Sequence, residues 1–204
     1  MSKIALLVTS TRVNAVGPAI GDWLKPILES AAPEATFTTV RVADFKLPVF
    51  DEVAIPAMVP AMAQWTKPHS KAWSAEIAKY DGYVILANEY NFGMSAATKN
   101  AIDYIYNEWI GKPILIVSYG IAGGSSASEQ LMKVLTGMKT KPIETRPQMS
   151  FLGGVGAPDL TAAMTQGTLG NETRESWEKE KKPEIVKGVQ ELMAVLKEAK
   201  ETKA

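Results

Sequence analysis

Residues 84–109 read VILANEYNFGMSAATKNAIDYIYNEW, and this stretch decides the fold. It begins with a continuous apolar run, which is typical of a strand covered on both faces. Five polar or aromatic residues and a glycine follow at 88–93, and apolar residues then recur at the three-to-four spacing of a one-sided helix. The stretch therefore predicts a buried strand, a loop crowded with amides and aromatic rings, and a helix from Ser95 to Trp109.

The same alternation extends along the chain. Apolar runs also lie at 4–8, 37–42 and 114–119, with a weaker candidate at 148–153. Helical spacing follows at 16–28 and 127–138, and again after Pro183. Alternating strands and helices predict one α/β domain over residues 1–204, a doubly wound parallel sheet of five strands in the order 2-1-3-4-5, with helices on both faces.

Between the second and third strands, residues 43–70 contain four prolines. Because proline breaks helices, this segment predicts an irregular surface excursion. It holds His69, the only histidine, which we expect to be a polar surface residue and not a catalytic base.

Composition excludes several classes of function. The chain has no cysteine, so disulfides, thiolate nucleophiles and cysteine-ligated metals are ruled out. Its 22 basic residues balance 22 acidic ones, without the basic stripe of a nucleic-acid binder. The first apolar run is too short for a signal peptide or a membrane span. We expect a cytoplasmic protein that binds neither nucleic acid nor membrane and holds no metal.

The loop after the first strand suits an anion. Residues 9–18 carry three consecutive hydroxyls, including Ser10, and then Arg12, just before a helix. Free amides at a helix start bind anions, and arginine adds paired donors. An ordinary serine or threonine cap, with Arg12 in solvent, would also explain the pattern.

The loops after the next two strands suit a planar ring. The amide and aromatic side chains at 88–93 could stack against and hydrogen-bond a heterocycle, or merely cover the sheet edge. Residues 118–129 place Gly120, Gly123 and Gly124 before a helix that we expect a serine to cap, and glycine permits close backbone approach. In a parallel sheet all three loops meet at the carboxyl ends of the strands, so we expect one shared site.

Four motifs make the interpretation specific: Ser10-x-Arg12, EYNFG at 89–93, KNAIDYIYNEWIGKP at 99–113 and VSYGIAGG at 117–124. In this order they resemble the flavodoxin-like NADPH-dependent FMN reductase family, which includes quinone, azo and chromate reductases. The chain is particularly similar to fungal quinone reductases, over roughly residues 3–138. Two positions depart from the family pattern, because Asn88 and Ser95 stand where proline is usual; we therefore expect a less rigid loop.

The resemblance implies FMN as cofactor and NADPH or NADH as co-substrate, without a catalytic side chain. The FMN phosphate would be held by Ser10, Arg12, Val16, Gly17 and Pro18. The isoalloxazine ring would be edged and covered by Glu89, Tyr90, Asn91, Phe92 and Gly93. Its pyrimidine side would meet Ser118, Tyr119, Gly120, Gly123 and Gly124, where backbone N–H groups of the loop would stabilise negative charge.

The reaction we expect is hydride transfer from NAD(P)H through FMN to a quinone or a similar acceptor, such as an azo dye, chromate or free flavin, by a ping-pong mechanism. Two other classes remain open. A flavodoxin-type electron carrier is disfavoured because such carriers dock through marked acidic charge, and this chain has a net charge of zero. An FMN-bound redox sensor of a partner protein is the other.

We also expect a homodimer, with a tetramer as the alternative. Tyr104, Tyr106 and Trp109 add more aromatic surface to the expected helix than one apolar stripe can hide, and excess apolar surface marks interfaces. The resembling family also dimerises.

Overall fold

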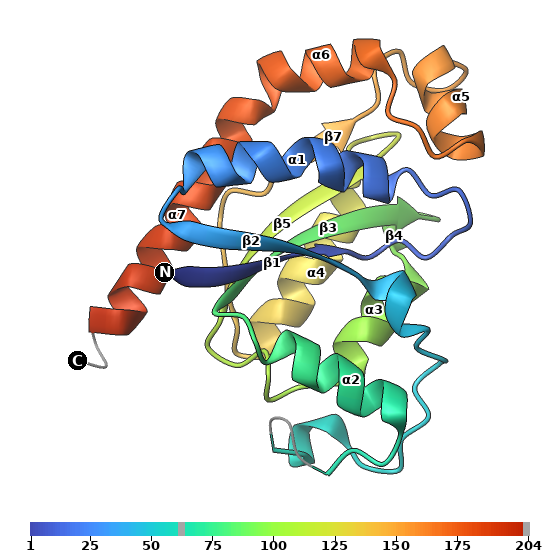
Figure 1. The fold of residues 1–204 in the computed structure, drawn as a ribbon. Coiled ribbons are helices and arrows are strands. Elements are labelled where there is room, and N and C mark those ends of the chain that lie inside the picture. Colours follow the sequence, from blue (N-terminus) through green and yellow to red (C-terminus); the bar gives the residue numbers. More distant parts are fainter. Residues whose placement is uncertain (61–63, 202–204) are drawn as a thin grey trace.

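The structure is a computed structural model that describes residues 1–60 and 64–201. At its centre lies a parallel sheet in which four long strands run in the order β2-β1-β3-β5 (Figure 1). These strands are β1 (Ser2–Val8), β2 (Ala35–Arg41), β3 (Gly82–Tyr90) and β5 (Pro113–Gly120). All three neighbouring pairs are parallel, so their carboxyl ends share one edge. The predicted doubly wound α/β fold is confirmed.

The fifth position of the sheet differs from the prediction in detail. Two short strands share it, both parallel to β5: β6 (Lys141–Pro142) at the start of β5 and β7 (Gln148–Ser150) at its end. The expected strand at 148–153 therefore stops at Ser150, and β6 was not predicted. A further short strand, β4 (Gly93–Met94), pairs antiparallel with β3.

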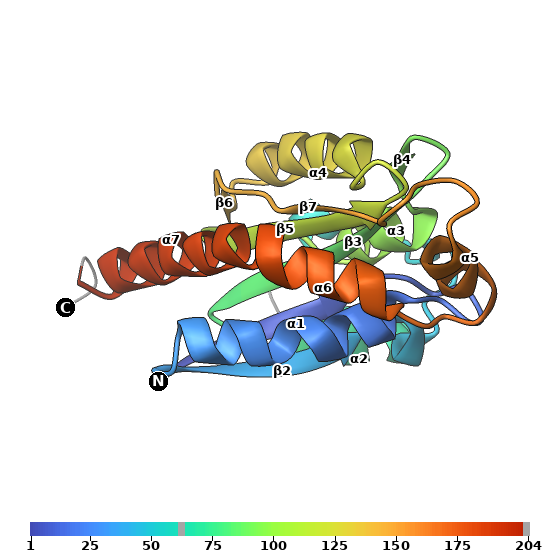
Figure 2. The ribbon, with the colours of Figure 1, turned by 90° about the horizontal axis from the view of Figure 1, so that it is seen from above.

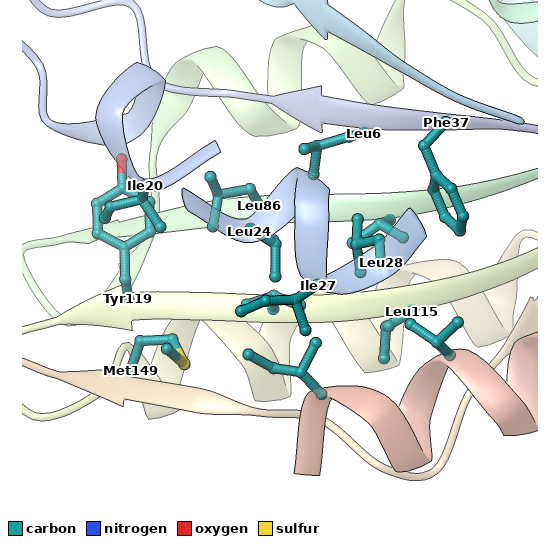
Figure 3. Close-up of a cluster of buried hydrophobic side chains, with 14 of the residues drawn as sticks. Leu6, Ile20, Leu24, Ile27, Leu28, Phe37, Leu86, Leu115, Tyr119 and Met149 are labelled. Atoms are coloured by element: carbon teal, nitrogen blue, oxygen red, sulfur yellow. The ribbon is translucent and has the colours of Figure 1, made fainter. Parts of the chain in front are cut away.

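Helices cover both faces of the sheet (Figure 2). One face carries α1 (Gly17–Ala31), α6 (Asn171–Glu180) and α7 (Lys182–Glu201), and the other carries α2 (Pro68–Ile77), α3 (Ala96–Asp103) and α4 (Ser125–Gly137). Alternate strand residues enter the two cores, so Leu6 packs on the α1 side and Leu7 on the other. Figure 3 shows Leu24 and Leu28 of α1 packed over the strands. Within the described residues, no helix is long and apolar enough to cross a membrane.

The segment between β2 and α2, residues 42–67, contains two 3-10 turns, η1 (Val42–Phe45) and η2 (Pro56–Met58). We call it the excursion segment; residues 61–63 of it lie outside the described residues. The predicted irregular course is confirmed up to Lys67, but α2 begins at Pro68 and was not predicted. Asn100 fastens the segment to α3, because its Nδ2 donates to the carbonyl of Pro48 at 2.6 Å and its Oδ1 accepts the N–H of Phe50 at 3.0 Å.

The helix expected from Ser95 to Trp109 is shorter than predicted. Helix α3 ends at Asp103, and residues 104–112 form turns. This region is rich in aromatic and β-branched residues, which are weaker helix formers. Tyr104 and Trp109 are 0% and 1% exposed, so they fill a core and do not form an aromatic surface. Contrary to our expectation, these two residues provide no surface for a dimer.

Two helices beyond β7 were not predicted. Helix α5 (Pro158–Thr165) lies beyond the carboxyl ends of the strands, and α6 then returns across the α1 face (Figures 1 and 2). The charge-rich run 175–184 belongs to α6 and the start of α7, where Trp177 is buried against Trp23 and Phe151.

Candidate functional site

A pocket of about 620 Å³ opens at the carboxyl ends of β1, β3 and β5. This volume lies within the range of small-molecule sites. The three predicted loops form most of its wall, through Arg12, Ala15, Val16, Asn88, Glu89, Tyr90, Asn91, Tyr119, Gly120 and Ile121. A fourth wall comes from Phe151, Leu160, Ala163 and Met164, that is, from the residue after β7 and from α5.

The prediction that the three loops meet is confirmed, but not every predicted residue reaches the pocket. Seven of them line it: Arg12, Val16, Glu89, Tyr90, Asn91, Tyr119 and Gly120. The others stand behind or beside the lining: Ser10, Gly17, Pro18, Phe92, Gly93, Ser118, Gly123 and Gly124. The fourth wall was missed because α5 carries only two buried residues, Leu160 and Ala163, and so shows little helical periodicity.

The first loop and the start of α1 bring together a group of hydrogen-bond donors that we call the cradle. The hydroxyl oxygen of Ser10 is buried and makes no hydrogen bond of normal geometry to a described residue, although it interacts with the nearby hydroxyl of Tyr119. A Cβ atom on Gly17 would lie 2.2 Å from that oxygen and 2.8 Å from the hydroxyl of Tyr119, so only glycine fits there. Burial raises the pKa of Tyr119, which keeps its hydroxyl protonated as a donor.

The start of α1 completes this cradle. No side chain caps α1, and its first turn has no acidic residue. The alternative interpretation is therefore wrong about a serine or threonine cap, although Arg12 is exposed, as that interpretation expected. The first N–H groups of α1 remain free at the positive end of the helix dipole. The donors that converge here fit a phosphate.

Arg12 borders the cradle and reaches across the pocket. Its Nη1 donates to the carbonyl of Met164 at 2.8 Å and to that of Val13 at 3.3 Å, and its Nη2 donates to the carbonyl of Ala163 at 3.5 Å. Arg12 is exposed, but these carbonyls hold its guanidinium group. It links the first loop to the C-terminal end of α5.

The second loop is a tight β-hairpin. Asn91 and Phe92 connect β3 to β4 with φ angles of 49° and 59°, as the two central residues of a type I′ turn require. Asparagine tolerates this conformation, whereas a bulky residue such as Phe92 is strained in it. Phe92 is nevertheless 86% exposed beside the pocket, and backbone strain of this kind is typical of functional loops.

Two side chains fasten this hairpin to α4. Gln130 accepts the N–H of Met94 at 3.1 Å and donates to the carbonyl of Phe92 at 3.4 Å. Glu89 accepts the N–H of Ala127 at 3.1 Å, in the first turn of α4. The expected serine cap of α4 is therefore wrong, because Gly124 occupies the cap position and Glu89 supplies the acceptor from another strand.

Asn88 and Ser95 are partners in the structure. Both are buried, and the Ser95 hydroxyl donates to Asn88 Oδ1 at 3.2 Å. Ser95 also caps α3 by accepting the N–H of Thr98, whose hydroxyl donates to that of Thr9 at 2.8 Å. This network ties the ends of β1 and β3 to α3, contrary to our expectation of a looser loop at the two proline positions.

The third loop is shaped by its glycines. Gly123 and Gly124 have φ angles of 75° and 72°, and a Cβ atom on Gly124 would lie 2.9 Å from the backbone of Tyr119. Ser118 donates its hydroxyl to the carbonyl of Gly123 at 2.8 Å, and the N–H of Gly123 donates to the carbonyl of Gly120 at 3.2 Å. Ser118, Gly123 and Gly124 therefore fold the loop, while Tyr119, Gly120 and Ile121 face the pocket.

His69 lies outside the pocket lining. Its Nε2 is 2.9 Å from Asp51 Oδ1 and 3.3 Å from the hydroxyl of Tyr104. Lys67 also pairs with Asp51, at 3.2 Å. His69 is thus a partly exposed member of a polar cluster at the base of the excursion segment.

Fold and site together define a flavodoxin-like α/β protein with a cofactor-sized pocket at the carboxyl edge of its sheet. Residues 2–150 match the model of the NADPH-dependent FMN reductase family. The chain belongs to this family and is an oxidoreductase.

Relatives and a solved structure agree with this assignment. The NAD(P)H-dependent FMN reductase ntnL of Nectria sp is 45% identical over 98% of this chain and 100% of its own. A fission yeast (Schizosaccharomyces pombe) NAD(P)H-dependent FMN reductase is 37% identical over 82% and 84%. An Escherichia coli quinone reductase is 30% identical over 70% and 76%. The structure of RosB with bound 8-demethyl-8-formylriboflavin-5'-phosphate superposes with a TM-score of 0.69, at 14% identity over 100% of this chain and 82% of that chain, which supports the fold alone.

Proposed function

We propose that this protein binds FMN in the pocket and uses it to pass hydride from NAD(P)H to a quinone-like acceptor. The observation that carries the proposal is the buried Ser10 hydroxyl, which makes no hydrogen bond of normal geometry to a described residue and lies with the Tyr119 hydroxyl beside Gly17, at the uncapped start of α1. A site that leaves a buried donor unpaired next to free helix amides is completed by an anionic ligand.

The chain's own residues have distinct roles in this proposal. The phosphate is bound by Ser10, Arg12 and the first turn of α1, and the Tyr119 hydroxyl donates to it as well. Glu89 and Asn91 edge the ring system, with Tyr90 and Phe92 beside them as exposed aromatic cover. When bound, FMN supplies the hydride chemistry between nicotinamide and acceptor.

We propose that the third loop faces the pyrimidine edge of the ring. The stretch of backbone that does so is shorter than we expected from the sequence. The N–H of Gly123 is already taken by Gly120, and Gly124 packs on Tyr119. The stretch from Gly120 to Ile121, which lines the pocket, is therefore the part that can orient N–H dipoles toward negative charge on the ring.

The test of function has two parts. The purified protein should be yellow, and the released flavin should run as FMN on chromatography. Steady-state NADPH oxidation with a quinone should give parallel double-reciprocal lines, because one pocket takes nicotinamide and acceptor in turn. A protein that takes up no FMN would overturn the proposal, whereas intersecting lines would overturn only the ping-pong order.

Arg12 gives the sharpest test of how the phosphate is bound. A charge-assisted hydrogen bond is worth roughly 1.5 to 3 kcal/mol, so Arg12→Ala should weaken FMN about ten- to a hundredfold. Riboflavin, which lacks the phosphate, should lose little. Affinities come from quenching of flavin fluorescence, and Arg41→Ala, an exposed arginine at the end of β2, is the control. Equal losses for both flavins would remove Arg12 from the phosphate site.

We propose a homodimer that forms through exposed apolar side chains of the excursion segment. The excursion segment exposes Val49, Val53, Ile55 and Met58, and Phe92 is exposed near the pocket. Exposed apolar side chains in such number are typical of interfaces. Light scattering at micromolar protein should give twice the chain mass of 22.1 kDa, and a monomer mass would contradict it.

A further inference from the structure

Helix α5 is the least firmly held part of the pocket wall. It has eight residues, of which only Leu160 and Ala163 are buried. A helix this short is marginal without tertiary support. Glycines with positive φ flank it on both sides, at 153, 154, 156 and 167, where the chain can change direction at low cost. At its N-terminal end α5 is anchored to α6, because Asp159 accepts the N–H of Thr173 at 2.7 Å. Its C-terminal end depends on fewer contacts for its position.

Arg12 provides the polar contact at the C-terminal end of α5. Nη1 and Nη2 point to the carbonyls of Met164 and Ala163. Carbonyls at a helix end lack partners within the helix and carry the negative end of its dipole, so a guanidinium group is well matched to them.

The same guanidinium retains donors for another ligand. The contacts with Val13, Ala163 and Met164 use three of its five N–H groups. Nε and one N–H group of Nη2 make no hydrogen bond to a described residue, and Nε and Nη2 together form one edge of the planar guanidinium. That edge has the geometry with which arginine binds two oxygens of a phosphate.

A second contact brings the loop after α5 onto the first loop. A Cβ atom on Gly167 would lie 2.7 Å from the carbonyl oxygen of Asn14 and 3.0 Å from that of Ala15. The two backbones thus touch where only glycine permits it. The end of α5 is therefore joined to the first loop at Arg12 and again at Asn14 and Ala15.

We propose that Arg12 is a positioning residue that couples the cofactor's phosphate to the α5 wall: phosphate on its free edge fixes the guanidinium, and the fixed guanidinium holds α5 closed over the pocket. This inference rests on the proposed function, because it needs a phosphorylated flavin in the site. Helix α5 lies outside residues 2–150, which match the family model. The inference gives this helix a role, as a pocket wall that only the phosphorylated cofactor holds in place. Since the phosphate uses donors that α5 leaves free, it adds to the contact with α5 and does not displace it.

Hydrogen exchange measures the coupling directly. Amide exchange in residues 157–167 should slow when FMN binds to the wild-type protein and should change far less with riboflavin at equal saturation. In Arg12→Lys, which keeps the charge but not the planar fork, FMN should no longer slow this segment more than riboflavin does. The core segment 185–196 of α7 serves as the internal reference. Equal protection by the two flavins in the wild type, or none from either, would overturn the inference.

The reciprocal test leaves Arg12 in place. Coupling between two sites is mutual, so a displaced wall must weaken phosphate binding. Gly167→Ala pushes α5 away from Asn14, and Gly154→Ala is the matched control, because its φ of 65° is equally unusual but no atom lies within 4 Å of its Cβ position. The ratio of FMN to riboflavin affinity should fall about fivefold or more in Gly167→Ala and stay unchanged in Gly154→Ala.

The outcomes separate this inference from the proposed function. If neither flavin binds the wild-type protein, the proposed function fails. If FMN binds but Gly167→Ala and Gly154→Ala give the same affinity ratio, only the coupling fails. Circular dichroism of both variants establishes that they are folded before the ratios are compared.

Discussion

The sheet core and the α5 wall build the same pocket in different ways. The core side rests on strands whose side chains are almost fully buried, and hydrogen-bonded networks fasten each of its loops. The α5 wall rests on two buried side chains, on the contact of Gly167 with the first loop, and on two polar contacts, one from Arg12 and one in which Asp159 accepts the N–H of Thr173 in α6. The three loops at the edge of the sheet are fastened by hydrogen bonds from neighbouring elements, whereas the wall opposite them is held by fewer contacts. We therefore expect that substitutions in the core change the free energy of unfolding, whereas substitutions in the α5 wall change the ratio of FMN to riboflavin affinity.

The largest effect should separate the two regions by stability. Leu24→Ala in α1 removes a fully buried side chain from the larger core and should lower the free energy of unfolding by about 2–5 kcal/mol. Leu160→Ala in α5 should lower it by about 1 kcal/mol or less, because the helix can open locally and the loss cannot exceed its own small stability.

Urea denaturation followed by circular dichroism measures both variants. Similar losses in the two would show that α5 belongs to the same cooperative unit as the sheet. Helix α5 would then not open independently of the sheet.

The difference in burial between the sheet core and α5 determined which elements could be predicted from the sequence. The long strands, α1, α4 and α7 have continuous or periodic apolar residues because they bury whole faces, so their positions could be predicted within a few residues. The convergence of three loops followed from the parallel sheet. Helix α5 could not be predicted, because it places only Leu160 and Ala163 in a core.

Contacts that the sequence pattern does not indicate were the other reason that some predictions were wrong. Glu89 caps α4 from 38 residues away, and Ser95 compensates for Asn88 by a hydrogen bond that no local pattern indicates. Tyr104 and Trp109 have the spacing of a helix face, yet they are buried from a turn, where Trp109 packs edge-on against Tyr83.

The excursion segment exposes several apolar side chains, and a carboxylate fastens it to the residues before α2. Glu52 accepts the N–H groups of Thr66 and Lys67 at 3.1 and 2.8 Å, just before α2. Burial raises the pKa of Glu52, but the hydrogen bonds from Thr66 and Lys67 outweigh it and lower the pKa to about 2. A carboxylate whose pKa is lower in the folded state stabilises the protein above its unfolded pKa, near 4.5, and this contribution is lost as the pH falls toward 2.

Glu52→Gln should therefore reduce the acid sensitivity of the protein. The urea midpoint of the wild type should fall between pH 5 and pH 2.5 more steeply than that of Glu52→Gln, while the variant starts from a lower value at pH 6. Glu175→Gln, an exposed change on α6, is the control and should follow the wild type. Identical pH profiles for wild type and Glu52→Gln would show that this carboxylate does not fasten the segment.

The smallest effect concerns His69, which lies in the excursion segment's polar cluster and outside the pocket lining. Its hydrogen bond is the main reason that the pKa of Asp51 falls to about 2, but Tyr104 and Lys67 also hold that carboxylate. His69→Ala should therefore leave kcat/KM for NADPH oxidation within about threefold, because hydride transfer requires no histidine acid or base. Its urea midpoint should drop slightly, and His69→Gln, which keeps a donor, should recover part of that drop. A hundredfold loss of rate with FMN still bound would place His69 in the reaction and would extend the functional site from the pocket into the excursion segment.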